Sequence, residues 1–377
     1  MAETTIFISA GDASGDLHAA NFMAEMEKKF DSCEFVGFGM ERMRKAGLRP
    51  LGEEDDADGA MWLHNLLRLG DFWRKLRRCR ELFDENPPQL VVLVDFGGFN
   101  LYVAREASRR RIPVVYYIPP QVWAHGKYRL KKIKKWVDRA IVIYPFEPQL
   151  YEEYGIDVKY VGHPLFDEVS RTDTAEEARW LQNRCGENLI ALFPGSRTQE
   201  VKANLPLSLK AAGRLEQRFD DLSLACVLPD QLKGPAREII RDARPEVKMP
   251  DISPAALARA ARLCLTKSGT ITLEIAAMGT PMVILYRLHP FIYFLGLGLH
   301  ETPYVGLINN LAGEMICPER VMPWADADWL EREALRFLEN ERDYERCTAR
   351  MRQVLAGYAC PGASKKAAEM AAEMCQS

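Results

Sequence analysis

The fold is decided by residues 90–100, which read LVVLVDFGGFN. Five apolar residues, three of them valine, lead to Asp95 and then to a Phe-Gly-Gly bend. A run of this kind is typical of a parallel strand that is buried on both faces. Asp95 would leave the sheet at the carboxyl end of a strand, where open α/β sheets bind their ligands. The pattern therefore predicts a carboxylate in a ligand site. The alternative is an aspartate that caps a helix starting near Asn100.

Strand and helix patterns alternate along the rest of the chain, which predicts an α/β fold with doubly wound sheets. The 377 residues exceed one typical hydrophobic core, so two domains are expected. Six strand signals, most followed by a helix, complete a first Rossmann-like domain over residues 1–168. A second set predicts another such domain over residues 169–350. Residues 351–377 are expected to form a C-terminal helix, which packs back either on its own N-terminal domain or on a neighbouring subunit.

Composition and charge exclude several classes of protein. The formal net charge of −3 gives no global attraction to nucleic acid. The nine cysteines are odd in number and contain no CxxC pair, so neither a disulfide framework nor a thiolate metal site is indicated. The first residues lack the basic segment of a signal peptide, and no apolar run reaches the roughly 18 residues of a membrane span. A cytoplasmic protein is expected.

The loop GDASGD, at residues 11–16, follows the first predicted strand. It lacks both the GxGxxG spacing of dinucleotide sites and the P-loop lysine. Gly11, Ser14 and Gly15 can still line a small polar pocket at a helix N-terminus, where backbone N–H groups attract anions. The alternative is a tight turn in which Ser14 or Asp16 caps the helix. His163, at the end of a later strand, likewise either contacts a ligand or caps a turn.

Residues 60–83 are predicted to form an amphipathic helix. Trp62, Leu66, Leu69 and Trp73 recur at helical spacing on one face, and arginines and lysines make the remainder basic. Tryptophan, leucine and a basic flank together suit a helix that lies in a membrane interface. The alternative is a core-facing helix with an ordinary charged exterior.

Two Gly-Ser elements in the second half predict an anion site. PGSR, at residues 194–197, places Arg197 at the start of one helix, and SGT, at residues 268–270, opens another. Helix N-terminal N–H groups, hydroxyls and a guanidinium together suit a pyrophosphate that needs no metal. Glu274 lies one turn further on and is placed to accept hydrogen bonds from ribose hydroxyls. The alternative for each element alone is an N-capped helix.

Two DxD patterns, at residues 56–58 and 326–328, are the obvious candidates for metal ligands. The first lies in an acidic loop and the second near a predicted helix start, and neither follows a buried strand. Both are therefore interpreted as solvated or capping residues, and no metal or other cofactor is predicted.

Two Rossmann-like domains, a nucleotide diphosphate site in the second and a carboxylate in the first describe a GT-B glycosyltransferase. The chain resembles the lipid A disaccharide synthase family of inverting GT-B enzymes, and the resemblance extends over nearly its whole length. The motifs that carry it are SGD within residues 11–16, FVG at 35–37, Asp95 with Phe99 and Asn100, PxxVWA at 119–124, Gly162 with His163, PGSR with Glu200, SGTxTLE at 268–274, Tyr286 with Arg287, and NxLAG at 309–313.

The resemblance implies two domains that face a central cleft, and it implies the reaction. The donor would be UDP-2,3-diacylglucosamine, and the acceptor would be 2,3-diacylglucosamine 1-phosphate (lipid X). The products would be the β-1,6-linked disaccharide 1-phosphate and UDP. Asp95 matches the family's essential aspartate and would take the proton from the acceptor 6-hydroxyl. Both substrates carry acyl chains, so peripheral binding to the inner membrane is expected, while a homodimer is left open.

The resemblance also implies the residues of each site. Arg197 would stabilise the charge on the leaving diphosphate and would share the catalytic role with Asp95. The donor would be held by Ser196, Arg197, Ser268, Gly269, Thr270, Glu274, Arg287 and Asn309. The acceptor side would be lined by Ser14, Asn100, Gln121 and His163. The membrane would be met by Trp62, Leu66, Leu69 and Trp73.

Three residues depart from the family pattern. Asp12 stands where the family usually has Glu, Gly98 stands where many members have a second acid, and His125 replaces a tryptophan. These departures bear on acyl-chain preference and acceptor fit, and they leave the type of reaction in place.

Two rival functions are weighed against this one. The first is another UDP-sugar enzyme of similar architecture, such as a 2-epimerase or a MurG-like transferase. An epimerase needs no surface for acyl chains, so the tryptophan-rich helix argues against it. The second is a catalytically silent nucleotide-sugar-binding membrane protein, and an intact Asp95 argues against that.

Overall fold

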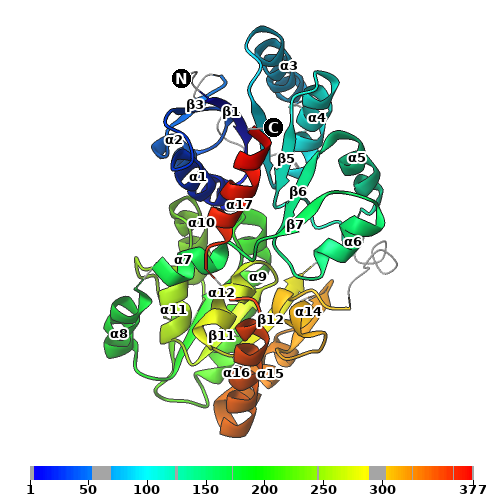
Figure 1. Ribbon diagram of the computed structural model, residues 1–377. Helices are drawn as coiled ribbons and strands as arrows, with labels where there is room; N and C mark the ends of the chain where they lie inside the picture. The colour runs from blue at the N-terminus through cyan, green and yellow to red at the C-terminus, as the bar shows by residue number, and fades with distance from the viewer. Residues whose placement is uncertain are drawn as a thin grey trace. The chain divides into compact units, whose positions relative to one another are not determined.

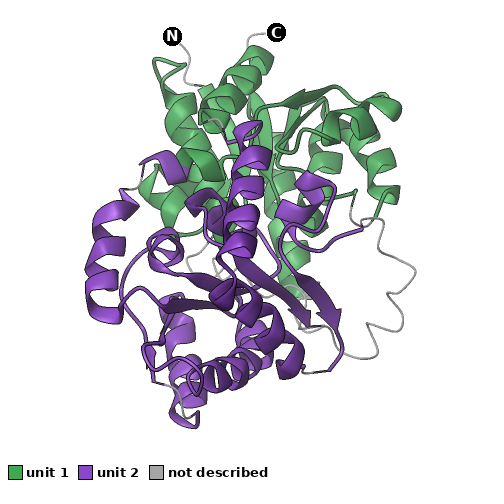
Figure 2. Ribbon diagram, turned by 90° about the horizontal axis from the view of Figure 1, so that it is seen from below, with its two compact units in different colours: residues 1–167, 360–377 green, residues 168–359 purple. Residues whose placement is uncertain are grey.

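The structure is a computed structural model that describes residues 4–52, 69–123, 126–171, 173–243, 246–287, 303–324, 326–359 and 361–375. The chain divides into two compact units, shown in Figure 2. Unit 1 contains Met1–Asp167 and Cys360–Ser377, and unit 2 contains Glu168–Ala359. The return to unit 1 comes later than the sequence predicted, because helix α16 (Glu341–Ala356) continues within unit 2 beyond residue 350.

Unit 1 is built on a seven-stranded parallel sheet with the order β3-β2-β1-β4-β5-β6-β7. The chain winds outward from β1 to β3, then returns to the other side of β1 and winds outward again. Strand β4 is buried at all five positions, as a strand covered on both faces must be. The strands are β1 (Thr4–Ser9), β2 (Cys33–Phe38), β3 (Leu48–Pro50), β4 (Leu90–Val94), β5 (Val114–Tyr117), β6 (Arg139–Val142) and β7 (Val158–Tyr160).

Helices flank this sheet, and Figure 1 shows α17 beside α1. The helices of unit 1 are α1 (Ala13–Glu27), α2 (Glu41–Lys45), α3 (Leu69–Glu85), α4 (Gly97–Arg109), α5 (Tyr128–Trp136), α6 (Glu147–Glu153) and α17 (Ala363–Ala372). A 3-10 turn at Glu373–Cys375 follows α17. Helix α7 (Leu165–Arg171) begins in unit 1 and ends in unit 2.

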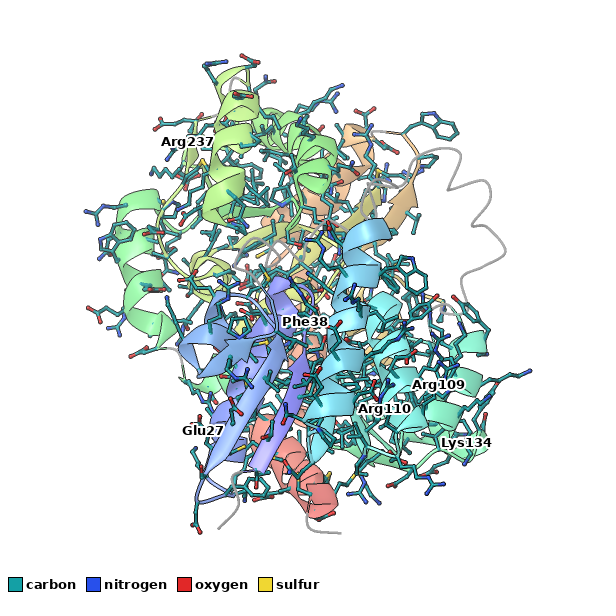
Figure 3. The ribbon with its side chains drawn as sticks, turned by 90° about the horizontal axis from the view of Figure 1, so that it is seen from above. Glu27, Phe38, Arg109, Arg110, Lys134 and Arg237 are labelled. Carbon is teal, nitrogen blue, oxygen red and sulfur yellow. The ribbon has the colours of Figure 1, made fainter. Side chains whose placement is uncertain are left out.

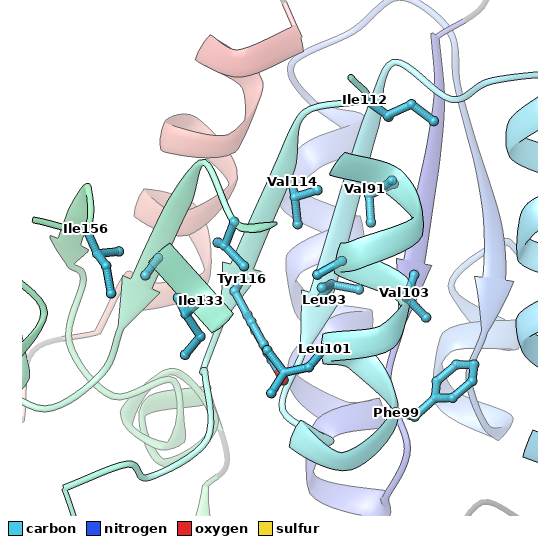
Figure 4. Close-up of a cluster of buried hydrophobic side chains, with 14 of the residues drawn as sticks. Val91, Leu93, Phe99, Leu101, Val103, Ile112, Val114, Tyr116, Ile133 and Ile156 are labelled. Carbon is cyan, nitrogen blue, oxygen red and sulfur yellow. The ribbon is translucent and has the colours of Figure 1, made fainter. Parts of the chain in front are cut away.

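The core of unit 1 fixes the carboxyl end of β4. Figure 4 shows Val91, Leu93, Val114 and Tyr116 of β4 and β5 packed against Leu101 and Val103 of helix α4. Each of these side chains is at most 5% exposed. Burying one large apolar side chain contributes about 1.5–3 kcal/mol, so this cluster holds the end of the strand firmly. Asp95 follows at that end.

The C-terminal helix α17 docks on unit 1 through apolar and polar contacts. Its alanines at positions 363, 367, 368 and 371 are fully buried. The Asp167 carboxylate accepts the first N–H groups of the helix, including that of Ser364 at 2.9 Å. Lys29 pairs with Glu369 at 2.9 Å, and Arg139 pairs with Glu373 at 2.9 Å.

Unit 2 contains a six-stranded parallel sheet with the order β10-β9-β8-β11-β12-β13. Its strands are β8 (Leu189–Phe193), β9 (Ser223–Cys226), β10 (Val247–Lys248), β11 (Leu263–Lys267), β12 (Met282–Arg287) and β13 (Glu319–Met322). Its helices are α8 (Thr174–Cys185), α9 (Thr198–Leu215), α10 (Asp230–Arg241), α11 (Pro254–Ala260), α12 (Ile271–Met278), α14 (Leu307–Ala312), α15 (Ala327–Glu339) and α16. Among the described residues, no helix is long and apolar enough to cross a bilayer.

Candidate active site

The two loops predicted as ligand sites in unit 1 meet at one point of the sheet. Strands β1 and β4 are neighbours, and the winding of the chain reverses between them. In doubly wound sheets the loops that follow such strands diverge and leave a crevice for ligands. Here these loops carry Gly11 and Asp95. Gly15, in the first turn of α1, lies so close that an added Cβ would be 3.7 Å from the Cβ of Asp95.

Asp95 lies in a strained turn. Asp95 and Phe96 have φ angles of 48° and 52°, in the left-handed region that costs a non-glycine residue about 1–3 kcal/mol. The turn is held by its neighbours, because the Asp95 carbonyl accepts hydrogen bonds from Asn100 Nδ2 at 2.9 Å and from the Tyr116 hydroxyl at 2.8 Å. Strain of this kind is typical of functional sites.

The capping alternative for Asp95 is wrong. Helix α4 begins at Gly97, and its N-cap is Phe96. A capping carboxylate accepts the N–H of the second or third helical residue, whereas Asp95 Oδ1 accepts the N–H of Phe96 at 2.7 Å. The half-buried carboxylate therefore belongs to the sheet edge and not to the helix end.

Helix α1 begins at Ala13, inside the predicted loop at residues 11–16, because its cap is Asp12. The Asp12 carboxylate accepts the N–H of Gly15 at 2.7 Å. Neither Ser14 nor Asp16 caps α1, so that alternative is wrong. Asp16 is buried and accepts backbone N–H groups at the start of α2, including that of Met40 at 2.6 Å. Ser14 is exposed, and its hydroxyl lies 3.3 Å from His18 Nε2.

Asn100 supports the turn from behind and does not line the acceptor side. Its side chain is fully buried. The Asn100 Nδ2 group donates to the carbonyl oxygens of Ser9, Val94 and Asp95, and Oδ1 accepts the Ser9 hydroxyl at 2.8 Å. One amide thus joins the ends of β1 and β4, so we assign Asn100 a positioning role.

The loop after β5 packs against the same turn. A Cβ added to Gly97 would lie 2.2 Å from Cγ of Pro120, which only glycine allows without movement. Gln121, predicted on the acceptor side, is exposed in this loop. Gly98 is exposed too, and an added Cβ would meet none of the described residues within 4 Å, so a second acid at this position would have room. His125 lies outside the described residues.

His163 caps a turn and is buried. Its Nδ1 accepts the N–H of Leu165 at 3.1 Å, at the start of α7, and its side chain is 4% exposed. Burial lowers the pKa of His163 to about 3, and the nearby His18 lowers it further. Burial also lowers the pKa of His18 to about 4, although Asp12 and Asp167 act in the opposite direction. Both imidazoles are therefore neutral near pH 7.

We expect His163→Asn to reduce the acid sensitivity of the fold. The folded-state pKa of His163 lies below its ordinary value of 6.5, so its stabilising contribution is present above pH 6.5 and is lost as the pH falls. Asparagine can accept the same N–H but does not titrate. Between pH 6.5 and 4.5, the free energy of unfolding of the unmodified protein should fall by about 2–3 kcal/mol more than that of the variant. Urea unfolding at both pH values measures this, and parallel pH dependences would contradict it.

Unit 2 places its two Gly-Ser loops side by side. Strands β8 and β11 are neighbours at the point where the winding of this sheet reverses. PGSR follows β8 and leads into α9, whereas SGT follows β11 and leads into α12. The N-cap residues, Arg197 and Thr270, make no capping hydrogen bond with their own side chains to the described residues. Ser196, Arg197 and Thr270 are exposed, which suits contact with a ligand.

Glu200 links these loops. Its Oε2 accepts the N–H of Ser196 at 2.9 Å, and its Oε1 pairs with Lys267 Nζ at 3.1 Å. Gly195 has a φ of 133°, and an added Cβ there would lie 2.5 Å from Cβ of Glu200. Lys267 thus belongs to an ion pair that joins the two loops.

Ser268 and Asn309 are both fixed by hydrogen bonds within unit 2. The Ser268 hydroxyl donates to the Val305 carbonyl. Asn309 is fully buried; its Nδ2 donates to Glu319 Oε2 at 2.8 Å, and its Oδ1 accepts the N–H of Cys317 at 3.0 Å. Glu319 also accepts the N–H groups of Val305 and Gly306. Asn309 therefore shapes the loop, and we assign it a positioning role.

Glu274 and Arg287 lie at the border of this region. Glu274 is half-buried, and burial raises its pKa to about 7, although a backbone hydrogen bond from Ala255 opposes this. Arg287 donates to the Ala203 carbonyl of α9 at 2.7 Å. Gly269 has room around it, since an added Cβ would come no closer than 3.9 Å to Lys267 Nζ.

The carboxylates of the second DxD pattern, at residues 326–328, cap a helix and form ion pairs. Asp326 caps α15 by accepting the N–H of Trp329 at 2.9 Å and pairs with Arg320, while Asp328 pairs with Arg214. The first pattern, at residues 56–58, lies outside the described residues. Within the described part of the chain, no three His, Cys, Asp or Glu side chains gather in a way that could hold a metal ion.

Helix α3 contains only the end of the predicted membrane-facing segment. Trp62 and Leu66 lie outside the described residues, as does the side chain of Leu69. From Phe72 onward the buried seam is Leu76, Cys79 and Phe83, so this part of the helix faces the core. Trp73 lies off the seam and is 52% exposed.

Comparison with known proteins identifies the family. The sequence model described as lipid-A-disaccharide synthetase matches residues 6–374. The chain belongs to the lipid-A-disaccharide synthetase family. A relative in this family, the lipid-A-disaccharide synthase of Geobacter sulfurreducens, is 35% identical, and the match covers 99% of each chain. The chain is thus a GT-B glycosyltransferase, as the sequence predicted.

Solved structures outside the family share the fold. The UDP-GlcNAc 2-epimerase from Neisseria meningitidis bound to UDP-GlcNAc has a TM-score of 0.63 at 12% identity, over 99% of this chain and 100% of that one. MurG of Acinetobacter baumannii has a TM-score of 0.60 at 13% identity, over 99% and 100%. At such low identity the likeness extends to architecture alone, so neither the 2-epimerase nor the MurG-like function is favoured.

Three supporting residues were missed by sequence reasoning: Tyr116, Glu147 and Glu319. Tyr116 bonds to Asp95 on the neighbouring strand end, 21 residues earlier, and the strand order brings the two together. Glu319 bonds to Asn309, 10 residues earlier, through the fold of the intervening loop. Glu147, in the sequence YPFEP, could have been found from the sequence. A single carboxylate between aromatic residues just after a strand indicates a glutamate that is buried, which is unusual for this residue type.

Proposed function

We propose that this protein condenses UDP-2,3-diacylglucosamine with 2,3-diacylglucosamine 1-phosphate (lipid X). The products are the β-1,6-linked disaccharide 1-phosphate and UDP. The observation that carries this proposal is an intact Asp95, held on a strained turn at the reversal point of unit 1, in a chain that matches the family over residues 6–374. The fold alone would fit many UDP-sugar enzymes.

Asp95 is the general base in this proposal. Its carboxylate takes the proton from the 6-hydroxyl of the acceptor while that oxygen attacks the anomeric carbon of the donor. The bond to the diphosphate breaks as the new glycosidic bond forms, so the anomeric configuration is inverted. A positioned base contributes roughly 10²–10⁴-fold to the rate. The strained turn and the Asn100 amide fix the backbone from which this carboxylate extends.

Unit 2 binds the nucleotide in this proposal. The exposed Ser196 and Arg197 and the N–H groups of α9 contact the diphosphate, as do Gly269 and Thr270 before α12. Ser268 holds this second loop in place through its hydrogen bond to Val305. Negative charge develops on the diphosphate as it leaves, and the Arg197 guanidinium stabilises it by roughly 3–4 kcal/mol, the value of one oxyanion donor. Glu274 accepts ribose hydroxyls, Arg287 supports the site from the end of β12, and Asn309 positions the loop.

The direct test is product formation. Purified protein is incubated with both acylated substrates, and the disaccharide 1-phosphate is sought by mass spectrometry. Reactions that lack either substrate serve as controls. We expect the disaccharide and UDP in equal amounts, and only when both substrates are present. A hexosamine released without transfer, or an epimerised donor, would overturn the proposal.

Peripheral membrane binding is a second part of the proposal. Exposed aromatic side chains, Trp73 and Tyr102, lie beside Phe72, which packs against Trp73 at 5.4 Å and Tyr102 at 5.0 Å between ring centres. Arg105 lies over the Tyr102 ring, 5.6 Å from its centre, and Figure 3 shows further basic residues, Arg109, Arg110 and Lys134, elsewhere on unit 1. Aromatic rings at the interface and cations facing anionic lipid are a typical combination.

We expect Trp73→Ser to weaken binding to vesicles of phosphatidylethanolamine and phosphatidylglycerol by about tenfold, the equivalent of losing roughly 1.5 kcal/mol of apolar burial. Vesicle sedimentation measures the affinity. The matched control is Trp324→Ser, because Trp324 is also exposed, at 62%, but lies in unit 2. Equal affinities for the unmodified protein and the Trp73 variant would show that this surface does not meet the membrane.

A further inference from the structure

We propose that Glu147 is a positioning residue for the acceptor. Through the indole of Trp123 it fixes the loop at residues 118–123, and that loop packs against the turn that carries Asp95. The inference rests on the proposed function, because the acceptor side is defined there by the role of Asp95 as base.

Glu147 joins the ends of two strands with one carboxylate. Its side chain is 1% exposed. The Glu147 Oε1 atom accepts the Trp123 indole N–H at 3.1 Å, from the loop after β5. The Oε2 atom accepts the backbone N–H groups of Ile143 at 3.1 Å and Tyr144 at 3.0 Å, at the end of β6. Three N–H donors from two loops thus converge on this carboxylate. Because the side chain is buried, water cannot take the place of a donor that is lost.

Aromatic packing fixes the indole in the same place. Trp123 is 9% exposed and lies edge-on to Tyr144 and Phe146, with ring centres 5.6 and 5.1 Å away. Tyr144 and Phe146 are stacked at 5.5 Å. A buried indole N–H that loses its acceptor costs free energy, so this packing is stable only while Glu147 accepts the bond.

The loop that Trp123 ends is in contact with the Asp95 turn. Pro120 packs so closely on Gly97 that an added Cβ would lie 2.2 Å from its ring. Tyr116, at the other end of the loop in β5, donates its hydroxyl to the Asp95 carbonyl at 2.8 Å. A shift of this loop would therefore move both the wall beside Asp95 and the exposed Gln121.

The Glu147 carboxyl also changes its charge near neutral pH. Burial raises its pKa to about 7, while the hydrogen bonds from Tyr144, Ile143 and Trp123 act in the opposite direction. The titratable groups that face it are the phenols of Tyr144 and Tyr151, whose pKa values burial raises, so both stay neutral. An ionised carboxylate can accept all three N–H groups, whereas a protonated one must donate from one oxygen. The loop is therefore held best above pH 7.

The test compares Glu147→Gln with Glu153→Gln, which changes an exposed glutamate of the same helix α6. Steady-state kinetics give the KM for each substrate and kcat between pH 6 and 8. In the unmodified protein we expect the acceptor KM to rise as the pH falls below 7. Glu147→Gln should raise the acceptor KM about tenfold, abolish that pH dependence and leave the donor KM unchanged. Glu153→Gln should match the unmodified protein.

A second variant covers the case in which Glu147→Gln does not fold. Trp123→Phe keeps an aromatic ring and removes only the donated N–H, so it should also raise the acceptor KM and leave the donor KM unchanged. Where both variants fold, their combined effect should be smaller than the product of the two, since they break one contact. An acceptor KM and pH profile that stay unchanged in either variant would overturn the inference. Such a result would leave the proposed function intact, whereas an unmodified protein that makes no disaccharide would refute the function itself.

Discussion

Replacing Asp95 with asparagine should lower kcat for disaccharide formation by roughly 10²–10⁴-fold. Asparagine has the shape of aspartate, and its side-chain oxygen can still accept the N–H of Phe96 that Asp95 accepts at 2.7 Å. The left-handed turn tolerates asparagine well. The variant therefore removes only the ability to take a proton from the acceptor hydroxyl. Release of UDP from both substrates together measures kcat.

The matched control for this variant is Asp84→Asn. Asp84 is also an aspartate of unit 1, but it is exposed and pairs with Arg110 on the surface at 2.7 Å. We expect its kcat to stay within about twofold of the unmodified protein, because a surface ion pair contributes little. If Asp95→Asn retained a comparable kcat, Asp95 would not be the base.

Arg197→Ala should lower kcat/KM for the donor by roughly 10²–10³-fold, the effect of removing one donor to a developing anion. Arg197 is exposed at the N-cap position of α9. Burial and Glu200 raise the pKa of Tyr286, at the end of β12, while the charge of Arg197 lowers it. Because Arg197 lies in the loop that follows β8, it is at the carboxyl edge of the sheet. The rate is measured at saturating acceptor, so that only donor use is compared.

The control for Arg197→Ala is Arg237→Ala. Arg237 is an exposed arginine of α10 in unit 2, labelled in Figure 3, and it has no place in the proposed site. Its kcat/KM should be unchanged. A loss as large in this control would mean that the charge of the whole unit, and not Arg197 itself, governs donor use.

Much of the fold was predictable because the central strands carry their signal locally. The five apolar residues before Asp95 predicted a doubly buried strand, and β4 is buried throughout. The capping of α1 was not predictable in the same way. Ser14 and Asp16 have the right chemistry for a cap, but Asp12 takes that position, and Asp16 is drawn instead to the N–H groups of α2, which lie far along the chain.

For the candidate site, the sequence predicted which loops end strands better than it predicted what each residue does there. The loops with Asp95, Arg197 and Ser268 were found because glycine, serine and charge gather at strand ends. Asn100 and Asn309 have the same polar signal, yet both are fully buried and bond to backbone groups. Burial depends on the packing of neighbouring strands, which a single sequence does not contain. Trp73 shows the same limit, since its helical spacing fitted a membrane face while the seam at Leu76 faces the core.

We propose a division of labour, in which unit 2 binds the nucleotide and Asp95 of unit 1 takes the proton from the acceptor. Calorimetric titration of UDP into the two variants tests it most directly. Asp95→Asn should bind UDP with the affinity of the unmodified protein, and Arg197→Ala should bind it at least about tenfold more weakly. Loss of UDP binding in Asp95→Asn, with full binding in Arg197→Ala, would contradict this division of labour.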